Sequence, residues 1–314
     1  MKMTLPSHEG PSTLRAMRLP PTLGAGARVA LVSPSGPLPS RDELDVAIAN
    51  AASFGWEPVV GRHALAKLGY LAGTDEERAG DFNAALRDDR IDGIWCIRGG
   101  YGAMRIMPML DTDAMRRHPR AVIGYSDITA LHATFANTSN IVSFHGPTAR
   151  GTISDFSRGS LERAVVQRVD PCGVAPGART LRAGTAKGTL VGGNLAIVAA
   201  LCGTPYAPDY TNAILVLEDV GEATYRIDRM LRQLALSGAL AKVAGIAFGQ
   251  FTDGTAPDDA TSRPLDDVLA EAAALAGVPA IAGIPLGHIA EQWTIPLGAT
   301  AELDADQPAL HVTL

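Results

Sequence analysis

The sequence predicts an α/β protein built on a parallel β-sheet with helices on both faces. Short apolar runs, of the kind found in strands covered on both faces, occur at residues 28–33, 93–97 and 121–124. Between these runs lie amphipathic stretches that begin at helix-capping residues, so strands and helices alternate along the chain. The length of 314 residues suggests about two domains of this kind.

The elements of the first half follow from caps and periodicity. Ser40 followed by Glu43, and Thr74 followed by Glu77, have the spacing of capping boxes and predict the starts of two helices. The other elements expected here are strands at 56–60 and 141–144, a helix through residue 107 and a helix over 126–135.

The second half is separated by a region in which the pattern weakens. Proline and glycine recur between residues 168 and 186 and predict a linker. Beyond it we expect a helix to about residue 201, strands at 213–219, 245–249 and near 281, helices around 227–234 and 265–274, and antiparallel β-structure over 293–314. We therefore predict a leader at 1–24, an N-terminal domain at 25–167, a linker at 168–186 and a C-terminal domain at 187–314.

Composition argues against several classes of protein. The net charge of −6, with no run of Lys or Arg, argues against nucleic-acid binding. The three cysteines, Cys96, Cys172 and Cys202, are too scattered for a disulfide framework or a zinc site. The N-terminus lacks the apolar core of a signal peptide, and the most apolar stretch, residues 272–287, is too broken to span a membrane. We expect a cytoplasmic protein with no membrane or nucleic-acid partner, no metal and no cofactor.

Ser126 occupies the most informative position in the chain. The apolar run 121–124 ends at Gly124, and helix-forming sequence follows Ser126 at once. A serine in such a strand–turn–helix can be a nucleophile facing the N–H groups of the new helix, or it can simply cap that helix. The Gly-x-Ser-x-Gly elbow is half matched, because Ile128 stands where the second glycine would be. These residues alone leave both interpretations open.

Two other loops follow strands of the same sheet, and such sheets place ligands beyond the carboxyl ends of their strands. They are Ser33-Pro34-Ser35-Gly36 and Arg98-Gly99-Gly100-Tyr101-Gly102. The N–H groups of the second loop could hold a phosphate or a developing oxyanion. It matches neither the P-loop nor the dinucleotide-binding spacing, and it is equally compatible with an ordinary turn.

A serine nucleophile needs a base, and the base needs an orienting carboxylate. The candidate bases are His145, at the end of a predicted strand, and His288, which follows Pro285-Leu286-Gly287; either could also be a structural histidine. Glu218 and Asp219 close an otherwise apolar strand, where an acid is costly unless it is paired or works in a site. An exposed acid just past the strand is the alternative.

Taken together, these motifs resemble the serine LD-carboxypeptidases, a family that also contains the microcin-immunity hydrolases. The resemblance covers about residues 27–312. The matching motifs are Val32-Ser33-Pro34-Ser35-Gly36, Ile97-Arg98-Gly99-Gly100-Tyr101-Gly102, Ile123-Gly124-Tyr125-Ser126-Asp127, Gly192-Gly193-Asn194-Leu195, Leu217-Glu218-Asp219-Val220-Gly221-Glu222, Tyr225-Arg226-Ile227-Asp228-Arg229-Met230-Leu231 and Pro285-Leu286-Gly287-His288.

The resemblance implies a role for each site residue. Ser126 would be the nucleophile, His288 the base and Glu218 the acid that orients it, and the N–H groups of Gly100 and Asp127 would form the oxyanion hole. The implied fold is a flavodoxin-like N-terminal domain joined to a smaller α/β C-terminal domain, in a homodimer.

The resemblance also implies a reaction. The family typically removes the terminal D-alanine from a murein tetrapeptide in cytoplasmic peptidoglycan recycling, and Arg98 or Arg226 could bind the free carboxylate of the substrate. The alternatives are a microcin-immunity-type hydrolase of acyl-adenylates and a non-catalytic small-ligand module that kept the fold. The segment 220–236 is more similar to the peptidase branch.

Overall fold

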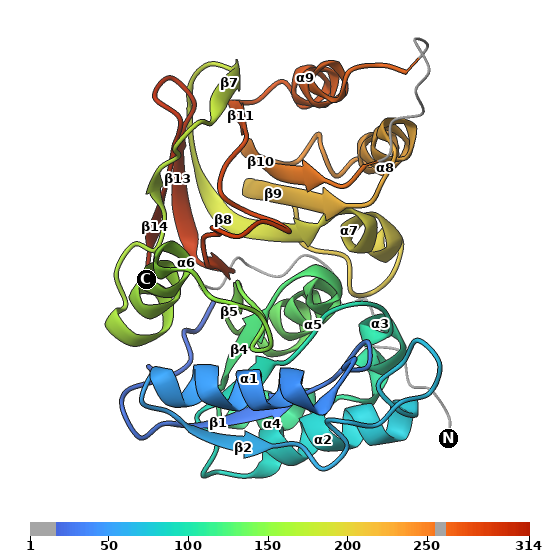
Figure 1. The fold of residues 1–314 in the computed structure, drawn as a ribbon. Helices are drawn as coiled ribbons and strands as arrows, with labels where there is room; N and C mark the ends of the chain where they lie inside the picture. The colour runs from blue at the N-terminus through green and yellow to red at the C-terminus, as the bar shows by residue number, and fades with distance from the viewer. Residues whose placement is uncertain (1–16, 255–261) are drawn as a thin grey trace.

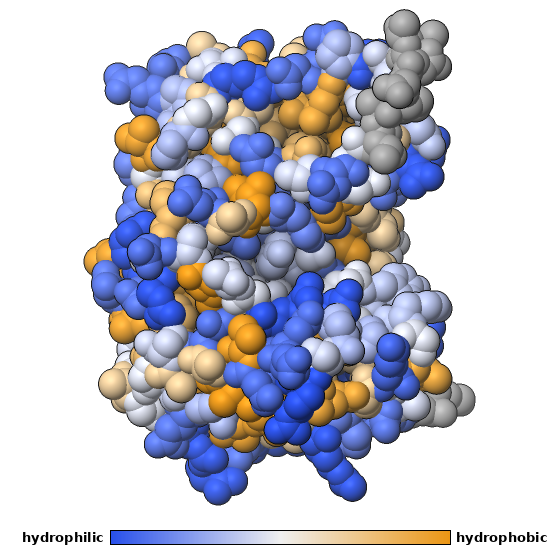
Figure 2. Space-filling model, viewed as in Figure 1, coloured by the Kyte–Doolittle hydropathy of each residue, from blue (hydrophilic) through white to orange (hydrophobic). Residues whose placement is uncertain are grey.

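The computed structural model describes residues 17–254 and 262–314. Two β-sheets, each accompanied by helices, form the two parts of the molecule (Figure 1). The face seen in Figure 2 is mostly hydrophilic, and its outline is indented on the right between these two parts. No helix within the described ranges is long and apolar enough to cross a membrane.

The first sheet has five parallel strands in the spatial order β2-β1-β3-β4-β5. They are β1 (Arg28–Val32), β2 (Glu57–Val60), β3 (Gly93–Cys96), β4 (Ala121–Gly124) and β5 (Ser143–His145). This order is that of flavodoxin-like folds, so the predicted α/β class and the implied flavodoxin-like domain are confirmed. The carboxyl ends of β1, β3 and β4 lie at one edge, which brings together the loops singled out in the sequence.

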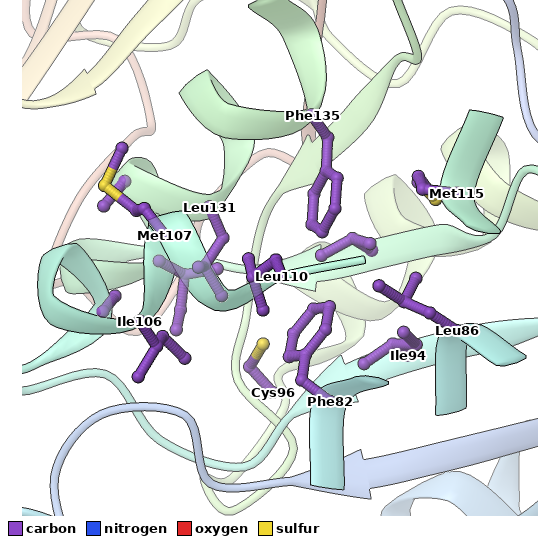
Figure 3. Packing of buried hydrophobic residues seen from close by; sticks show 14 of the residues in the cluster. Phe82, Leu86, Ile94, Cys96, Ile106, Met107, Leu110, Met115, Leu131 and Phe135 are labelled. Atoms are coloured by element: carbon purple, nitrogen blue, oxygen red, sulfur yellow. The ribbon is translucent and has the colours of Figure 1, made fainter. Parts of the chain in front are cut away.

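Helices cover both faces of this sheet, as predicted. One face packs on α1 (Arg41–Ser53), and the other on α2 (Asp75–Arg87), α3 (Ala103–Ile106), α4 (Thr112–Arg117) and α5 (Thr129–Ser139). Alternate residues of β1 enter the two cores, because successive side chains of a strand point to opposite faces. Within the larger core the rings of Phe82 and Phe135 stack with centroids 5.7 Å apart (Figure 3).

The two predicted capping boxes differ. Thr74 Oγ1 accepts the N–H of Glu77 at 3.2 Å, and the Glu77 carboxylate accepts the N–H of Thr74 at 2.8 Å, so this box begins α2 as expected. Ser40 does precede α1, but its side chain makes no capping hydrogen bond. The spacing therefore predicted both helix starts but only one of the two boxes.

The second sheet has a parallel centre and antiparallel flanks, in the order β6-β14-β13-β8-β9-β10-β11-β7. Its parallel strands are β8 (Thr185–Asn194), β9 (Ala213–Val220), β10 (Gly245–Thr252) and β11 (Ala280–Ala282); its antiparallel strands are β6 (Gly173–Val174), β7 (Arg179–Arg182), β13 (Thr300–Asp304) and β14 (Ala309–Thr313). The helices α7 (Leu195–Leu201), α8 (Thr224–Leu236) and α9 (Leu265–Ala276) pack on one face.

Several segments differ from the expectations. The predicted linker 168–186 contains β6, β7 and the start of β8, because its backbone pairs at the edges of the second sheet. The region 151–167 forms α6 (Asp155–Glu162) and a π-helical turn η3 (Arg163–Gln167). The tail is antiparallel as predicted, but its first strand, β12 (Ile295–Leu297), pairs with β5 of the first sheet.

The predicted leader also needs correction where it is described. Residues 1–16 lie outside the described part of the chain. Arg18 forms a β-bridge with Ile141, and Leu23 is fully buried against the first sheet. Residues 17–24 therefore belong to the packed structure.

Candidate active site

Ser126 lies in a strained turn at the carboxyl end of β4. A 3-10 turn, η2 (Ser126–Ile128), precedes α5, so the regular helix begins three residues later than predicted. Ser126 has a φ of 65°, which non-glycine residues adopt only where their surroundings impose it. Its side chain caps neither η2 nor α5. The helix-cap interpretation is therefore wrong, and the hydroxyl is left available.

The glycine-rich loop after β3 lies directly against Ser126. A Cβ placed on Gly99 would lie 3.0 Å from Ser126 Cβ and 3.3 Å from Ser126 Oγ, so a larger residue here would crowd Ser126. The next N–H group, that of Gly100, makes no hydrogen bond to any described residue, and neither does the N–H of Asp127. Two unpaired backbone donors thus lie in the segments that flank Ser126.

The Asp127 side chain connects the serine turn to the end of the glycine-rich loop. It is 2% exposed, and its Oδ2 accepts the N–H of Ala103, at the start of α3, at 2.8 Å. Burial raises the pKa of the Asp127 carboxyl above its ordinary value. Its side chain is structural, whereas its N–H group is free.

Glu218 and His288 form a buried pair on the second sheet. Glu218 is fully buried near the end of β9, and its Oε2 lies 2.9 Å from His288 Nδ1. A carboxylate only accepts hydrogen bonds, so Nδ1 carries the proton and Nε2 keeps its lone pair. The side chain of His288 is 20% exposed, which leaves the ring accessible. This is the arrangement of a general base oriented by an acid.

Gly287 lets the two chain segments approach. Its φ is 124°, and a Cβ there would lie 3.0 Å from Glu218 Oε2. The glycine that precedes His288 in the Pro-x-Gly motif therefore has a steric reason: a side chain there would crowd the Glu218 carboxylate.

The two sheets bring the serine turn and the Glu218–His288 pair together. The ring of His288 lies 4.8 Å, centroid to centroid, from the ring of Tyr125, which immediately precedes Ser126. Within the part of the chain that the structure describes, no hydrogen bond joins Ser126 Oγ to His288. The ring of His288 therefore lies against the residue that immediately precedes Ser126.

Asn194 contacts both Glu218 and Thr129, which follows the serine turn, and it was not assigned a role from the sequence. Its N–H donates to Thr129 Oγ1 at 3.0 Å, and its Nδ2 contacts Glu218 Oε1 at 3.3 Å and Asp219 Oδ1 at 3.0 Å. Thr129 begins α5, so Asn194 bridges the helix after the serine turn and the buried acid. Its signal in the sequence was the Gly192-Gly193-Asn194-Leu195 motif.

The second acid has a different role. Asp219 Oδ2 accepts the N–H of Ala196 at 2.9 Å and Oδ1 that of Val220 at 2.8 Å, so Asp219 supports the start of α7. Burial raises the pKa of Asp219 to about 6. Of the two acids that close β9, only Glu218 contacts His288.

His145, the other candidate base, is fully buried, and neither of its ring nitrogens has a hydrogen-bond partner among the described residues. Burial lowers its pKa well below 6.5. His132, on α5, lies beneath the turn: its Nε2 donates to the carbonyl oxygen of Gly124 at 2.8 Å, and its Nδ1 accepts from Ser143 Oγ. Neither histidine pairs with a carboxylate.

The two arginines expected near the substrate have different surroundings. Arg98 is half-buried and donates to the carbonyl oxygen of Pro37. Arg226 is exposed, at the start of α8, and its Nη1 lies 3.5 Å from the Glu222 carboxylate. No group of three His, Cys, Asp or Glu side chains that could hold a metal ion occurs within the described ranges.

Two family models together match most of the chain. The family model of the LD-carboxypeptidase N-terminal domain matches residues 29–146, and that of the C-terminal domain matches residues 187–303. A Streptomyces coelicolor protein, whose name marks it only as a candidate carboxypeptidase, is 41% identical over 95% of this chain and 96% of its own. The murein tetrapeptide carboxypeptidase of Pseudomonas aeruginosa is 36% identical over 89% of this chain and 94% of its own.

Solved structures share the fold. The muramoyltetrapeptide carboxypeptidase of Oxalobacter formigenes superposes with a TM-score of 0.81 at 27% identity, covering 91% of this chain and 98% of that one. The microcin C7 self-immunity protein MccF superposes with a TM-score of 0.86, covering 95% of this chain and 98% of that one. Its identity of 23% establishes likeness of fold alone.

Proposed function

The chain belongs to the LD-carboxypeptidase family, and from this premise we propose that it is a serine carboxypeptidase that releases the terminal D-alanine from murein tetrapeptide. The bond cleaved would join an L-centre to a D-residue. The observation that carries the proposal is the Glu218–His288 pair, at 2.9 Å, beside the turn that contains Ser126. The names of the Pseudomonas and Oxalobacter relatives support the substrate.

In the proposed reaction, Ser126 Oγ attacks the carbonyl carbon of the scissile bond while His288 Nε2 takes its proton. The imidazolium that forms is stabilised by Glu218, which is fully buried and holds Nδ1–H. His288 then protonates the leaving amine of D-alanine. Water, activated in turn by His288, hydrolyses the acyl-enzyme and restores Ser126.

We assign the oxyanion hole to the N–H groups of Gly100 and Asp127. Both lack partners among the described residues, and they lie on the two segments that flank Ser126. Preorganised donors of this kind stabilise the charge that develops on the carbonyl oxygen, and losing one costs about 10²–10³-fold in kcat.

The free carboxylate of the substrate needs a cation, and Arg98 and Arg226 are the candidates. Arg226 keeps its guanidinium in solvent near the carboxyl end of β9, whereas Arg98 uses one donor on Pro37. If Arg226 binds the carboxylate, Arg226→Gln raises KM for the tetrapeptide and leaves kcat little changed. An unchanged KM in this variant would transfer the role to Arg98, tested by Arg98→Gln.

The experiment that tests the function is D-alanine release from purified murein tetrapeptide by wild type and by Ser126→Ala. We expect turnover by wild type and a loss of at least about 10³-fold in the variant, since the triad would lack its nucleophile. Undiminished turnover by Ser126→Ala would overturn the assignment. Faster cleavage of an acyl-adenylate than of tetrapeptide would instead favour the microcin-immunity alternative, and absence of hydrolysis of both would favour a non-catalytic module.

The proposal includes a cellular context. We place the protein in the cytoplasm, as a homodimer that acts in peptidoglycan recycling without a metal or other cofactor. Light scattering of the purified protein tests the dimer, cell fractionation tests the location, and dialysis against a chelator tests the absence of a metal. Loss of activity on dialysis, restored by a divalent cation, would contradict the mechanism above.

A further inference from the structure

A buried arginine connects two of the loops that surround Ser126. Arg78, on α2, is 1% exposed, and its Nη1 donates to the carbonyl oxygen of Pro34 and, at 2.8 Å, to that of Gly102. Pro34 lies in the loop after β1, and Gly102 ends the glycine-rich loop after β3. A single guanidinium nitrogen therefore bridges the two loops.

The same two loops contact each other on the side of Ser126. The N–H of Gly36 donates to the carbonyl oxygen of Gly99 at 3.0 Å. Gly99 is the residue packed against Ser126, and the free N–H of Gly100 follows it. Any change in the spacing of the loops would therefore change where the Gly100 N–H points.

An acidic partner balances the charge of Arg78. Its Nη2 pairs with Asp75, which also accepts hydrogen bonds from Arg105 Nε at 2.9 Å and Nη2 at 2.7 Å. The hydrogen bond from Arg105 lowers the pKa of the Asp75 carboxyl, which keeps this partner charged. A buried ion pair seldom stabilises a fold more than apolar side chains of the same volume would. An arginine here is thus better explained by the carbonyl oxygens it holds than by stability.

We propose that Arg78 is a positioning residue for catalysis, which orients the glycine-rich loop so that the Gly100 N–H points at the developing oxyanion. This inference rests on the proposed function, since it concerns the oxyanion hole of that reaction. Lysine cannot replace Arg78, because one ammonium nitrogen cannot occupy the places of both Nη1 and Nη2.

The chain contains a matched control in Arg120. This arginine is 5% exposed, and its guanidinium also donates to two carbonyl oxygens, those of His118 at 2.7 Å and Asp88 at 3.1 Å. Burial lowers the pKa of both arginines, and neither Nε has a partner among the described residues. Arg120 precedes β4, at the end of the sheet opposite to Ser126. The two Arg→Lys substitutions therefore disturb similar surroundings at opposite ends of one sheet.

The experiment compares Arg78→Lys, Arg120→Lys and wild type in tetrapeptide hydrolysis, at a temperature where thermal melts show all three folded. We expect Arg78→Lys to lose at least about tenfold in kcat, with KM within about threefold of wild type. This loss is smaller than the cost of removing an oxyanion donor completely, because the Gly100 N–H is displaced and not removed. Arg120→Lys should keep kcat within about twofold of wild type, although its loss of Tm should be comparable to that of Arg78→Lys. Arg78→Ala should regain part of its kcat when guanidinium ion is added, and Arg120→Ala should not respond.

A second readout is independent of hydrolysis. Amide hydrogen exchange of the loops 33–37 and 98–103 should be faster in Arg78→Lys than in Arg120→Lys, since the Gly36–Gly99 hydrogen bond depends on the spacing of the loops. Equal exchange rates of these loops in the two variants would overturn the role of Arg78. So would losses of kcat that are the same in both variants for the same loss of Tm. Absence of D-alanine release by wild type would refute the proposed function instead.

Discussion

Replacing Glu218 by glutamine tests the proposed base most directly. The substitution preserves shape and removes one charge, and its consequence depends on which way the new amide faces. Asn194 Nδ2 approaches Glu218 Oε1 at 3.3 Å and can only donate, so the oxygen of the new amide must face Asn194. The amide nitrogen then faces His288 Nδ1, which lies 2.9 Å from the present Oε2. That nitrogen donates, so Nδ1 must become the acceptor.

The new hydrogen bond changes the tautomer of His288. Its proton moves to Nε2, and a protonated Nε2 cannot take the proton of Ser126. In serine hydrolases the equivalent acid-to-amide change costs about 10⁴-fold in kcat, or about 5.5 kcal/mol in the activation barrier. We expect about 10³–10⁴-fold here, because Glu218 is fully buried and is the acid paired with His288 Nδ1.

The assay is D-alanine release from murein tetrapeptide under saturating substrate, with urea unfolding of each variant alongside. The free energy of unfolding of Glu218→Gln should stay within about 1–2 kcal/mol of wild type, since both buried hydrogen bonds are kept. Glu302→Gln is the control, because Glu302 is an exposed acid on β13 paired with Lys187. A Glu218→Gln protein that keeps more than a tenth of the wild-type kcat would refute the reasoning.

Three further outcomes follow from the packing around the site. Burial lowers the pKa of His132 to about 4, so the unfolded state binds this proton more tightly and stability falls as the pH drops from about 6.5 to about 4, by up to about 3 kcal/mol. Urea unfolding at pH 7 and 5 checks this, and a wild-type loss no larger than that of His132→Gln would contradict it. Gly99→Ala should lower kcat at least about tenfold, because its Cβ would lie 3.0 Å from Ser126 Cβ; unchanged steady-state kinetics would show that the loop adapts. Gly287→Ala should destabilise the fold by about 1–2 kcal/mol and lower kcat, since it combines a φ of 124° with a contact of 3.0 Å to Glu218 Oε2. Equal unfolding midpoints for variant and wild type would argue against that strain.

Local patterns determined much of the fold. The alternation of buried strands and amphipathic helices predicted the first sheet and the α/β class, because periodicity along the chain reports directly which faces are covered. The same logic identified the carboxyl ends of β1, β3 and β4 as neighbours, since parallel strands end at one edge of their sheet. Where the backbone pairs at a sheet edge, as in β6 and β7, short polar strands carry too little pattern to be distinguished from a linker.

In the candidate site, too, local sequence predicts some features and only the tertiary structure decides the others. The sequence by itself determined that Ser126 follows a buried strand and that Glu218 closes another, because strand ends are local features. It could not determine from the residues alone whether His145 or His288 faces an acid. His288 and Glu218 are 70 residues apart, and only the tertiary structure, in which Gly287 allows the loop to approach β9, brings Nδ1 to 2.9 Å from the carboxylate. The left-handed φ of Ser126 and the two carbonyl oxygens held by Arg78 were likewise decided by packing, because they join segments that no periodicity connects.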